Sequence, residues 1–206
     1  MKNLRNILFL FLVFLLTGCG AKTPEKLVRS SLEQIKKLDE KTIQNFVSYQ
    51  DLVQNKTRDT DVGEETIEAV RLFFQNFDYS ILSTETNEDT ATVTVEIKNL
   101  DAKTLAHDLC LALTKISADP RTEDATTMNS YFTVLRDILK TNTYEESTTT
   151  ASFGLLRQSG NWKIQTTEEL KDEIVSGLIT ALKDPYLLTP EEVADATLGV
   201  FTDFSP

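Results

Sequence analysis

Residues 90–98 read Thr90-Ala91-Thr92-Val93-Thr94-Val95-Glu96-Ile97-Lys98, and this stretch decides the fold class. Apolar side chains occupy every second position, with threonine or a charged residue between them. Successive side chains of a strand point to opposite faces, so the alternation predicts a strand with one buried and one wet face. Tyr79, Ile81 and Ser83 alternate more weakly. The polar residues 86–89 predict a turn that joins the two segments in a hairpin.

A second hairpin is predicted over residues 143–166. The segment 143–157 is rich in threonine, a residue that favours strands, and the turn 158–161 leads into Trp162-Lys163-Ile164. Together the two hairpins predict an antiparallel sheet of about four strands.

Helical periodicity precedes and separates these hairpins. Thr23 followed by Pro24 predicts the start of a first helix, and Asp39 is the expected cap of a second. Between the hairpins, at about residues 101–140, two apolar stripes predict an antiparallel helical pair, the first helix capped by Asp101. Another helix follows the polar loop 54–63, and its apolar positions are Ile67, Val70, Phe73, Phe74 and Phe77.

Helices are also expected at the C-terminal end. Thr167 precedes a helix whose apolar face extends to Leu182, and Asp184-Pro185 ends it. Thr189-Pro190-Glu191-Glu192 forms a capping box that predicts a last short helix. The predicted fold class is therefore α+β: N-terminal helices packed on a curved antiparallel sheet, a helical pair inserted between two hairpins, and C-terminal helices.

The N-terminal residues predict a secretion signal. Lys2 and Arg5 precede ten apolar residues, 7–16, which as a helix would be too short to span a bilayer. Leu16-Thr17-Gly18-Cys19 resembles the lipobox at which bacteria attach diacylglycerol to a cysteine. We therefore expect residues 1–18 to be a lipoprotein signal peptide. Cys19 would become the diacylglyceryl- and palmitate-bearing membrane anchor, since two acyl chains hold stably. The alternative is an ordinary cleaved signal with Cys19 near the cut.

This signal predicts a protein of the cell membrane, on its extracytoplasmic face, and we favour the surface of a Gram-positive bacterium. Residues 19–206 are long enough for one domain, with 23–183 as the main body and 184–206 as a helical tail. A formal net charge of −11 argues against nucleic acid as a partner. With Cys19 committed to lipid, Cys110 has no disulfide partner within the chain.

We assign no catalytic, cofactor-binding or metal-binding residues from the sequence. His107, the single histidine, falls on the predicted solvent face of its helix, and Cys110 lies at the edge of the apolar stripe. The acidic residues 59–65 do not have the spacing of a calcium loop. No zinc, dinucleotide or P-loop motif is present in the sequence.

Aromatic side chains are the remaining candidates for a binding site. We expect them to fill the core, and the alternative is that several line an apolar pocket between the helices and the sheet. The candidate pocket residues are Phe74, Phe77, Tyr79, Tyr131, Phe132, Phe153 and Trp162.

The hairpin from Phe153-Gly154-Leu155-Leu156-Arg157 to Gly160-Asn161-Trp162-Lys163-Ile164, together with the lipobox and the helix and hairpin of residues 63–99, carries a resemblance. The chain resembles small bacterial lipoproteins with a nuclear-transport-factor-like, ketosteroid-isomerase-like or cystatin-like α+β domain. That resemblance implies a cone-shaped cavity that holds a ligand or partner, in isomerases, dehydratases and many non-enzymatic members. The catalytic aspartate and tyrosine of the enzymes have no counterpart that can be carried over.

The favoured hypothesis is a non-catalytic lipoprotein that binds an envelope protein or a small apolar ligand near the membrane. The alternative is an isomerase-like or hydratase-like enzyme with a pocket carboxylate. For that enzyme, Asp78 or Glu96 would have to point inward, and Asp137 is predicted to be exposed. A third hypothesis, the small solute-binding component of a transporter, fits the anchor but not the chain length.

Overall fold

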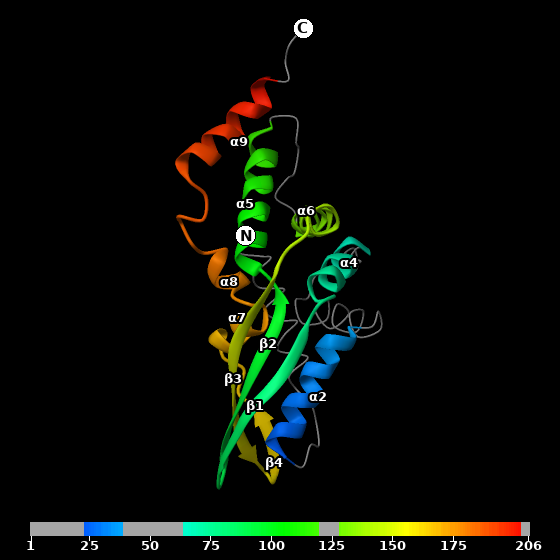
Figure 1. Cartoon of the computed structure of the whole chain (residues 1–206), viewed down its shortest axis with the longest axis vertical. Helices are drawn as coiled ribbons and strands as arrows, with labels where there is room; N and C mark the ends of the chain where they lie inside the picture. Colours follow the sequence, from blue (N-terminus) through cyan, green and yellow to red (C-terminus); the bar gives the residue numbers. More distant parts are fainter. Residues whose placement is uncertain (1–22, 39–63, 120–127, 203–206) are drawn as a thin grey trace, which may run out of the picture.

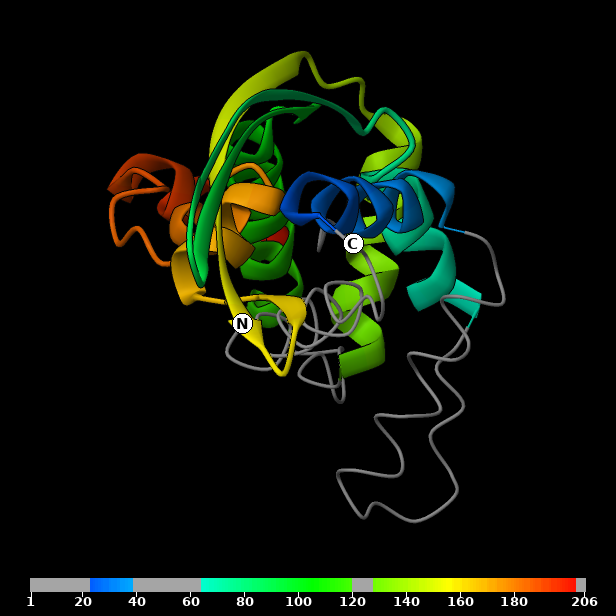
Figure 2. The same ribbon diagram turned by 90° about the horizontal axis from the view of Figure 1, so that it is seen from below.

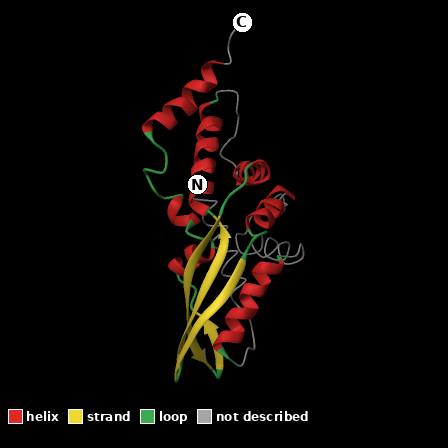
Figure 3. Cartoon of the chain, in the orientation of Figure 1, coloured by secondary structure: helices red, strands yellow, loops and turns green. Residues whose placement is uncertain are grey.

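The computed structural model describes residues 23–38, 64–119 and 128–202. Within them, β1 (Asp78–Asn87), β2 (Thr90–Leu100), β3 (Glu146–Gln158) and β4 (Asn161–Ile164) form one antiparallel sheet in the order β1-β2-β3-β4. Helices precede the sheet, are inserted between its hairpins and follow it (Figure 3). The predicted α+β fold, with about four antiparallel strands, is confirmed.

The first hairpin has the predicted buried face. β1 and β2 pair from Asp78 opposite Lys98 to Asn87 opposite Thr90. Val93, Val95 and Ile97 are all fully buried, whereas the residues between them face solvent or are half-buried. The period-two pattern therefore identified both the strand and its core face correctly.

The second hairpin closes at a tight turn between β3 and β4. Gln158 pairs with Asn161, and the two residues between them, Ser159 and Gly160, have φ values of 50° and 80°. Two successive left-handed residues suit a two-residue hairpin loop, and glycine adopts this conformation without strain. Trp162 follows directly and is buried on the core face.

Helix α2 (Pro24–Lys37) lies against β1, β2 and β4, and the strands curve around it (Figure 2). The Lys26 amide donates to the Thr23 hydroxyl at 3.4 Å, which confirms the predicted cap. Five side chains on one face of α2 are at most 1% exposed, and they are Leu27, Val28, Ser31, Leu32 and Ile35. This stripe covers the concave face of the sheet and makes it the core.

Helices α5 (Ala102–Ala118) and α6 (Met128–Thr141) occupy the predicted insertion but do not form an antiparallel pair. Figure 1 shows α5 along its length and α6 nearly end-on. Helix α6 instead packs beside α4 (Glu64–Phe73), where Lys140 Nζ lies 2.7 Å from Glu68 Oε1 and Arg136 lies 3.7 Å from Glu65. The apolar stripe of α6 thus has a partner distant in sequence, which periodicity alone does not identify.

Helix α4 also ends earlier than its apolar stripe suggests. Its last helical residue is Phe73, and Phe74 and Phe77 lie in the turn that leads into β1. The rings of Phe73 and Phe74 meet edge to face at 4.8 Å, and those of Phe74 and Phe77 at 5.7 Å. The aromatic cluster remains buried because packing, not helical continuity, holds these rings in place.

The helix predicted after Thr167 is broken into α7 (Glu168–Ile174) and α8 (Leu178–Ala181). Between them, Ser176 and Gly177 have φ values of 56° and 81°, which no right-handed helix accommodates. The Asp172 carboxylate accepts hydrogen bonds from both the amide and the hydroxyl of Thr180 and so joins the two short helices. The apolar spacing continues across this break, which explains the incorrect prediction of one helix.

The last helix, α9 (Pro190–Thr202), packs on α5 at one end of the molecule, and β4 and the turn joining β1 to β2 lie at the other (Figure 1). No described helix is both long enough and apolar enough to cross a membrane. The predicted signal peptide 1–18, the helix after Asp39 and the loop 54–63 lie outside the described residues.

Candidate functional site

An open groove lies between α5, the segment that joins α8 to α9, and α9. Its volume is about 650 Å³ and its surface is mostly apolar. Helix α5 provides one wall, α9 provides the other, and Tyr131 approaches from α6. The lining residues are Cys110, Leu113, Thr114, Ser117, Ala118, Tyr131, Leu182, Asp184, Pro185, Leu187, Leu188, Val193 and Thr197.

A capping box fixes the start of α9 and therefore the position of one wall. The Glu192 amide donates to the Thr189 hydroxyl at 3.2 Å, and the Thr189 amide donates to Glu192 Oε2 at 2.8 Å. This is the reciprocal geometry that the sequence Thr189-Pro190-Glu191-Glu192 predicts. Val193 and Thr197, one turn apart on α9, then both face the groove.

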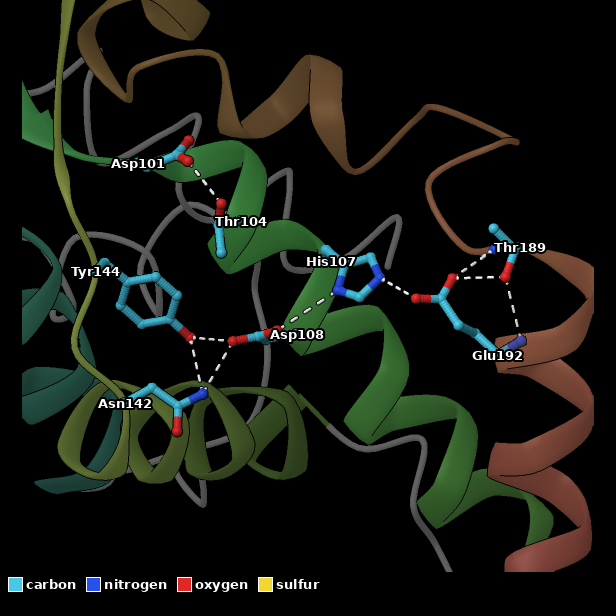
Figure 4. Close-up of polar contacts among 8 residues, drawn as sticks. All are labelled: Asp101, Thr104, His107, Asp108, Asn142, Tyr144, Thr189 and Glu192. Atoms are coloured by element: carbon cyan, nitrogen blue, oxygen red, sulfur yellow. Dashed lines mark hydrogen bonds and ion pairs between the residues drawn. The ribbon is translucent and has the colours of Figure 1, made fainter.

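His107 connects the two walls. Its Nε2 atom lies 2.9 Å from Glu192 Oε1 on α9, and its Nδ1 atom lies 3.5 Å from Asp108 Oδ1 (Figure 4). The side chain is 31% exposed, so the histidine predicted to face solvent is half-buried against α9. The helical wheel of α5 was correct about the core face, but α9 covers the opposite side from more than eighty residues away.

The pKa of Glu192 falls to about 2. The main cause is the hydrogen bond from the Thr189 amide, followed by those from the Thr189 hydroxyl and from His107. Each of these donors favours the ionised carboxylate. Glu192 therefore both caps α9 and presents a stable negative charge to the imidazole on α5.

The polar contacts continue from Asp108 to the segment that leads from α6 into β3. Asp108 Oδ2 accepts hydrogen bonds from the Tyr144 hydroxyl and from Asn142 Nδ2, both at 2.9 Å (Figure 4). Burial raises the pKa of Tyr144 well above its usual range, and the bond to Asp108 adds to this effect. At the start of α5, the predicted cap Asp101 accepts from the Lys103 amide at 3.1 Å and from the Thr104 hydroxyl at 2.6 Å. These bonds fix the start of α5 and hold its first half against the segment that leads into β3.

Cys110 lies half-buried on the groove side of α5, as its place at the edge of the apolar stripe predicts. Burial raises the pKa of its thiol. A thiol nucleophile requires the opposite shift, because the thiolate is the reactive form. The environment of Cys110 is therefore that of a structural residue in the wall.

The two threonine hydroxyls that line the groove are already hydrogen-bonded within their own helices. The Thr114 hydroxyl donates to the Cys110 carbonyl at 2.8 Å, and the Thr197 hydroxyl donates to the Val193 carbonyl at 3.0 Å. Asp184 Oδ1 accepts from the Tyr186 amide at 2.9 Å. The groove consequently presents mostly apolar contacts to an occupant, together with the Asp184 carboxylate and the hydroxyls of Ser117 and Tyr131.

The aromatic residues that the sequence analysis singled out are mostly core residues. Tyr79 and Tyr131 are partly buried and pack against the core, and Tyr131 also lines the groove. The pocket between helices and sheet that was the alternative prediction is occupied at these positions by packed rings. The five fully packed side chains are Phe74, Phe77, Phe132, Phe153 and Trp162.

The carboxylates that the enzyme hypothesis requires do not point inward. Asp78 is exposed and forms an ion pair with Lys36 at 2.7 Å, while Glu96 and Asp137 are also exposed. No aspartate or glutamate is buried among the described residues. In the same part of the chain, no three histidine, cysteine, aspartate or glutamate side chains are grouped so that they could bind a metal ion.

Asn99 is a buried polar residue that the sequence analysis did not identify. Asn99, near the end of β2, is fully buried, and neither atom of its amide group has a hydrogen-bond partner. Its place in the period-two pattern after Ile97 is the signal that could have identified it as inward-facing.

The predicted lipidation residue Cys19 and the rest of the lipobox, Leu16-Thr17-Gly18, lie outside the described residues. The resemblance to lipoproteins with a nuclear-transport-factor-like domain therefore stays a prediction. Comparisons of the chain with protein-family models, with curated proteins and with solved structures found no match.

Proposed function

We propose that the protein is a lipid-anchored, extracytoplasmic bacterial lipoprotein that acts as a non-catalytic binding module at the cell envelope. The observation that carries this proposal is the open, mostly apolar groove of about 650 Å³ between α5 and α9. Binding sites typically have volumes of about 300–1,000 Å³ and apolar walls with a few polar groups. The groove agrees with that description in both size and chemistry.

The position of α2 supports a groove that is presented to partners away from the bilayer. Under the proposal, Cys19 carries the lipid and only residues 20–22 separate it from Thr23. A fully extended chain covers about 3.5 Å per residue, so Thr23 would lie within about 14 Å of the lipid attachment. Helix α2 begins at the end of the molecule that holds β4, and α9 lies at the opposite end (Figure 1).

The side chains of the groove support binding over catalysis. The Cys110 thiol has a raised pKa, and the Asp184 carboxylate accepts a hydrogen bond from a backbone amide. The threonine hydroxyls donate hydrogen bonds to helix carbonyls. A thiol nucleophile needs a lowered pKa, and a hydroxyl nucleophile needs a neighbouring base that activates it. The described lining residues instead offer a surface for apolar contact.

The anchor can be tested with two matched serine variants. The chain has two cysteines, so Cys19→Ser and Cys110→Ser remove one thiol each. We expect the wild type and Cys110→Ser to sediment with membranes and to incorporate labelled palmitate. Cys19→Ser should lose both properties. Membrane retention of Cys19→Ser with an unchanged label would contradict the lipid anchor.

The binding surface can be tested with a photo-crosslinking amino acid in intact cells. It is placed at Leu188, which lines the groove, and separately at Leu82, an exposed residue of β1. We expect discrete adducts from position 188 only. Adducts of equal yield at both positions, or none at position 188, would argue against the groove as the binding surface.

A further inference from the structure

We propose that the groove binds a basic amphipathic helix of a partner protein. This inference rests on the proposed function and identifies the class of its partner. Helices commonly bind by placing one apolar face into a groove, with anchors at positions i, i+3, i+4 and i+7. An open groove walled by two helices, α5 and α9, has the corresponding form.

The charges around the groove favour a cationic partner. Among the residues that line the groove, Asp184 is charged and none is a lysine, arginine or histidine. Helix α9 as a whole contains three acidic residues and no lysine or arginine. The net charge of the whole chain is −11. Complementary charge speeds association and suppresses partners of like charge, so anionic amphiphiles such as fatty acids are disfavoured.

The apolar part of the surface is accessible to a partner. Val193 in the groove is 39% exposed, and Tyr186, between the lining residues Pro185 and Leu187, is 88% exposed. Exposed tyrosines are frequent anchors in protein interfaces. Leu198 of α9 is also strongly exposed, but it lies about 140° around the helix from Val193 and does not line the groove.

The hydrogen bonds within the groove indicate that the face of the partner in contact with it is apolar. Both lining threonines already donate to helix carbonyls, so they offer methyl groups rather than donors to an occupant. Asp184 retains acceptor capacity beyond the Tyr186 amide, because an ionised carboxylate accepts several hydrogen bonds. A leucine-rich helix face bordered by lysine or arginine satisfies both conditions.

Two synthetic peptides of about 18 residues test the proposal, a length at which a designed helix is stable. They share one leucine stripe, and their polar face carries lysine in one peptide and glutamate in the other. Both are titrated against the mature chain with Cys19→Ser, so that no acyl chain competes for the groove. We expect the lysine peptide to bind at least about tenfold more tightly than the glutamate peptide.

Two matched protein variants locate the binding. Val193→Glu and Leu82→Glu each replace an exposed apolar side chain by a carboxylate, one in the groove and one on β1. The proposal requires Val193→Glu to weaken the binding of the lysine peptide by about tenfold or more, although the added negative charge attracts that peptide. Leu82→Glu should change the affinity less than about twofold. Equal losses in both variants would overturn the proposal.

Alkylation of Cys110, which lines the groove, separates this inference from the proposed function. The reaction is followed at about pH 8.5, because the thiolate is the reactive form. Protection of Cys110 by the lysine peptide supports the inference. If a neutral small apolar dye or the glutamate peptide protects Cys110 and the lysine peptide does not, the groove is a binding site but the basic-helix inference is wrong. If none of the three protects it, both are wrong.

Discussion

Replacing Asn99 by leucine should stabilise the protein. Asn99 is fully buried, and both polar atoms of its side chain have no hydrogen-bond partner. An unsatisfied buried polar group costs about 1–3 kcal/mol, and leucine has nearly the outline of asparagine, so little repacking is needed. We expect Asn99→Leu to increase the free energy of unfolding by about 1–3 kcal/mol. For a domain of this size each kcal/mol raises Tm by about 2–4 °C.

Urea denaturation, followed by circular dichroism, measures this change. The slope of the unfolding free energy against urea concentration should be the same in the variant and the wild type. The matched control is Asn87→Leu, at the exposed end of β1, which should stay within about 0.5 kcal/mol of the wild type. A loss of more than about 1 kcal/mol in Asn99→Leu, with an unchanged spectrum, would refute the reasoning. The amide group would then have a polar partner that leucine cannot replace.

Three further substitutions test individual contacts. Glu192 has a pKa lowered to about 2, so its contribution to stability is present above its ordinary value of 4.5 and is lost as the pH falls from there towards 2. Glu192→Gln should flatten this part of the acid denaturation curve, and Glu191→Gln should not. Burial, followed by the hydrogen bond to Glu33, raises the pKa of Tyr79 to about 12, so stability should fall between pH 10 and 12 and Tyr79→Phe should reduce that fall. Thr167→Ala removes the cap of α7 and should cost about 1 kcal/mol in thermal denaturation, whereas Thr167→Ser should retain most of it.

The parts of the fold that the sequence predicted correctly depend on local rules. Four helices begin at the predicted cap, whose side-chain oxygen accepts a hydrogen bond from a backbone amide two or three residues later. The caps are Thr23, Asp101, Thr167 and Thr189. Strand alternation is equally local, since it needs only one buried face. The broken helix at Gly177 shows the limit, because apolar spacing continues across a break that backbone conformation creates.

The groove could not be predicted from the sequence, since its walls come from distant segments. Cys110 and Leu113 belong to the inserted helix, and Leu188 and Val193 belong to the C-terminal region. Each segment has an apolar stripe that is also consistent with core packing, and nothing in a stripe specifies its partner. The capping box predicted where α9 begins but not that α9 would pack on α5.

The contact between His107 and Glu192 suggests how the groove keeps its shape. Among the α9 residues whose burial is described, only Ala196 is buried, so apolar packing alone gives α9 a limited hold on α5. The contact of 2.9 Å between His107 Nε2 on α5 and Glu192 Oε1 on α9 adds a polar connection between the two walls. Because the residues that bind and the residues that hold α9 are different, substitution of His107 should change the affinity of the groove without altering its lining.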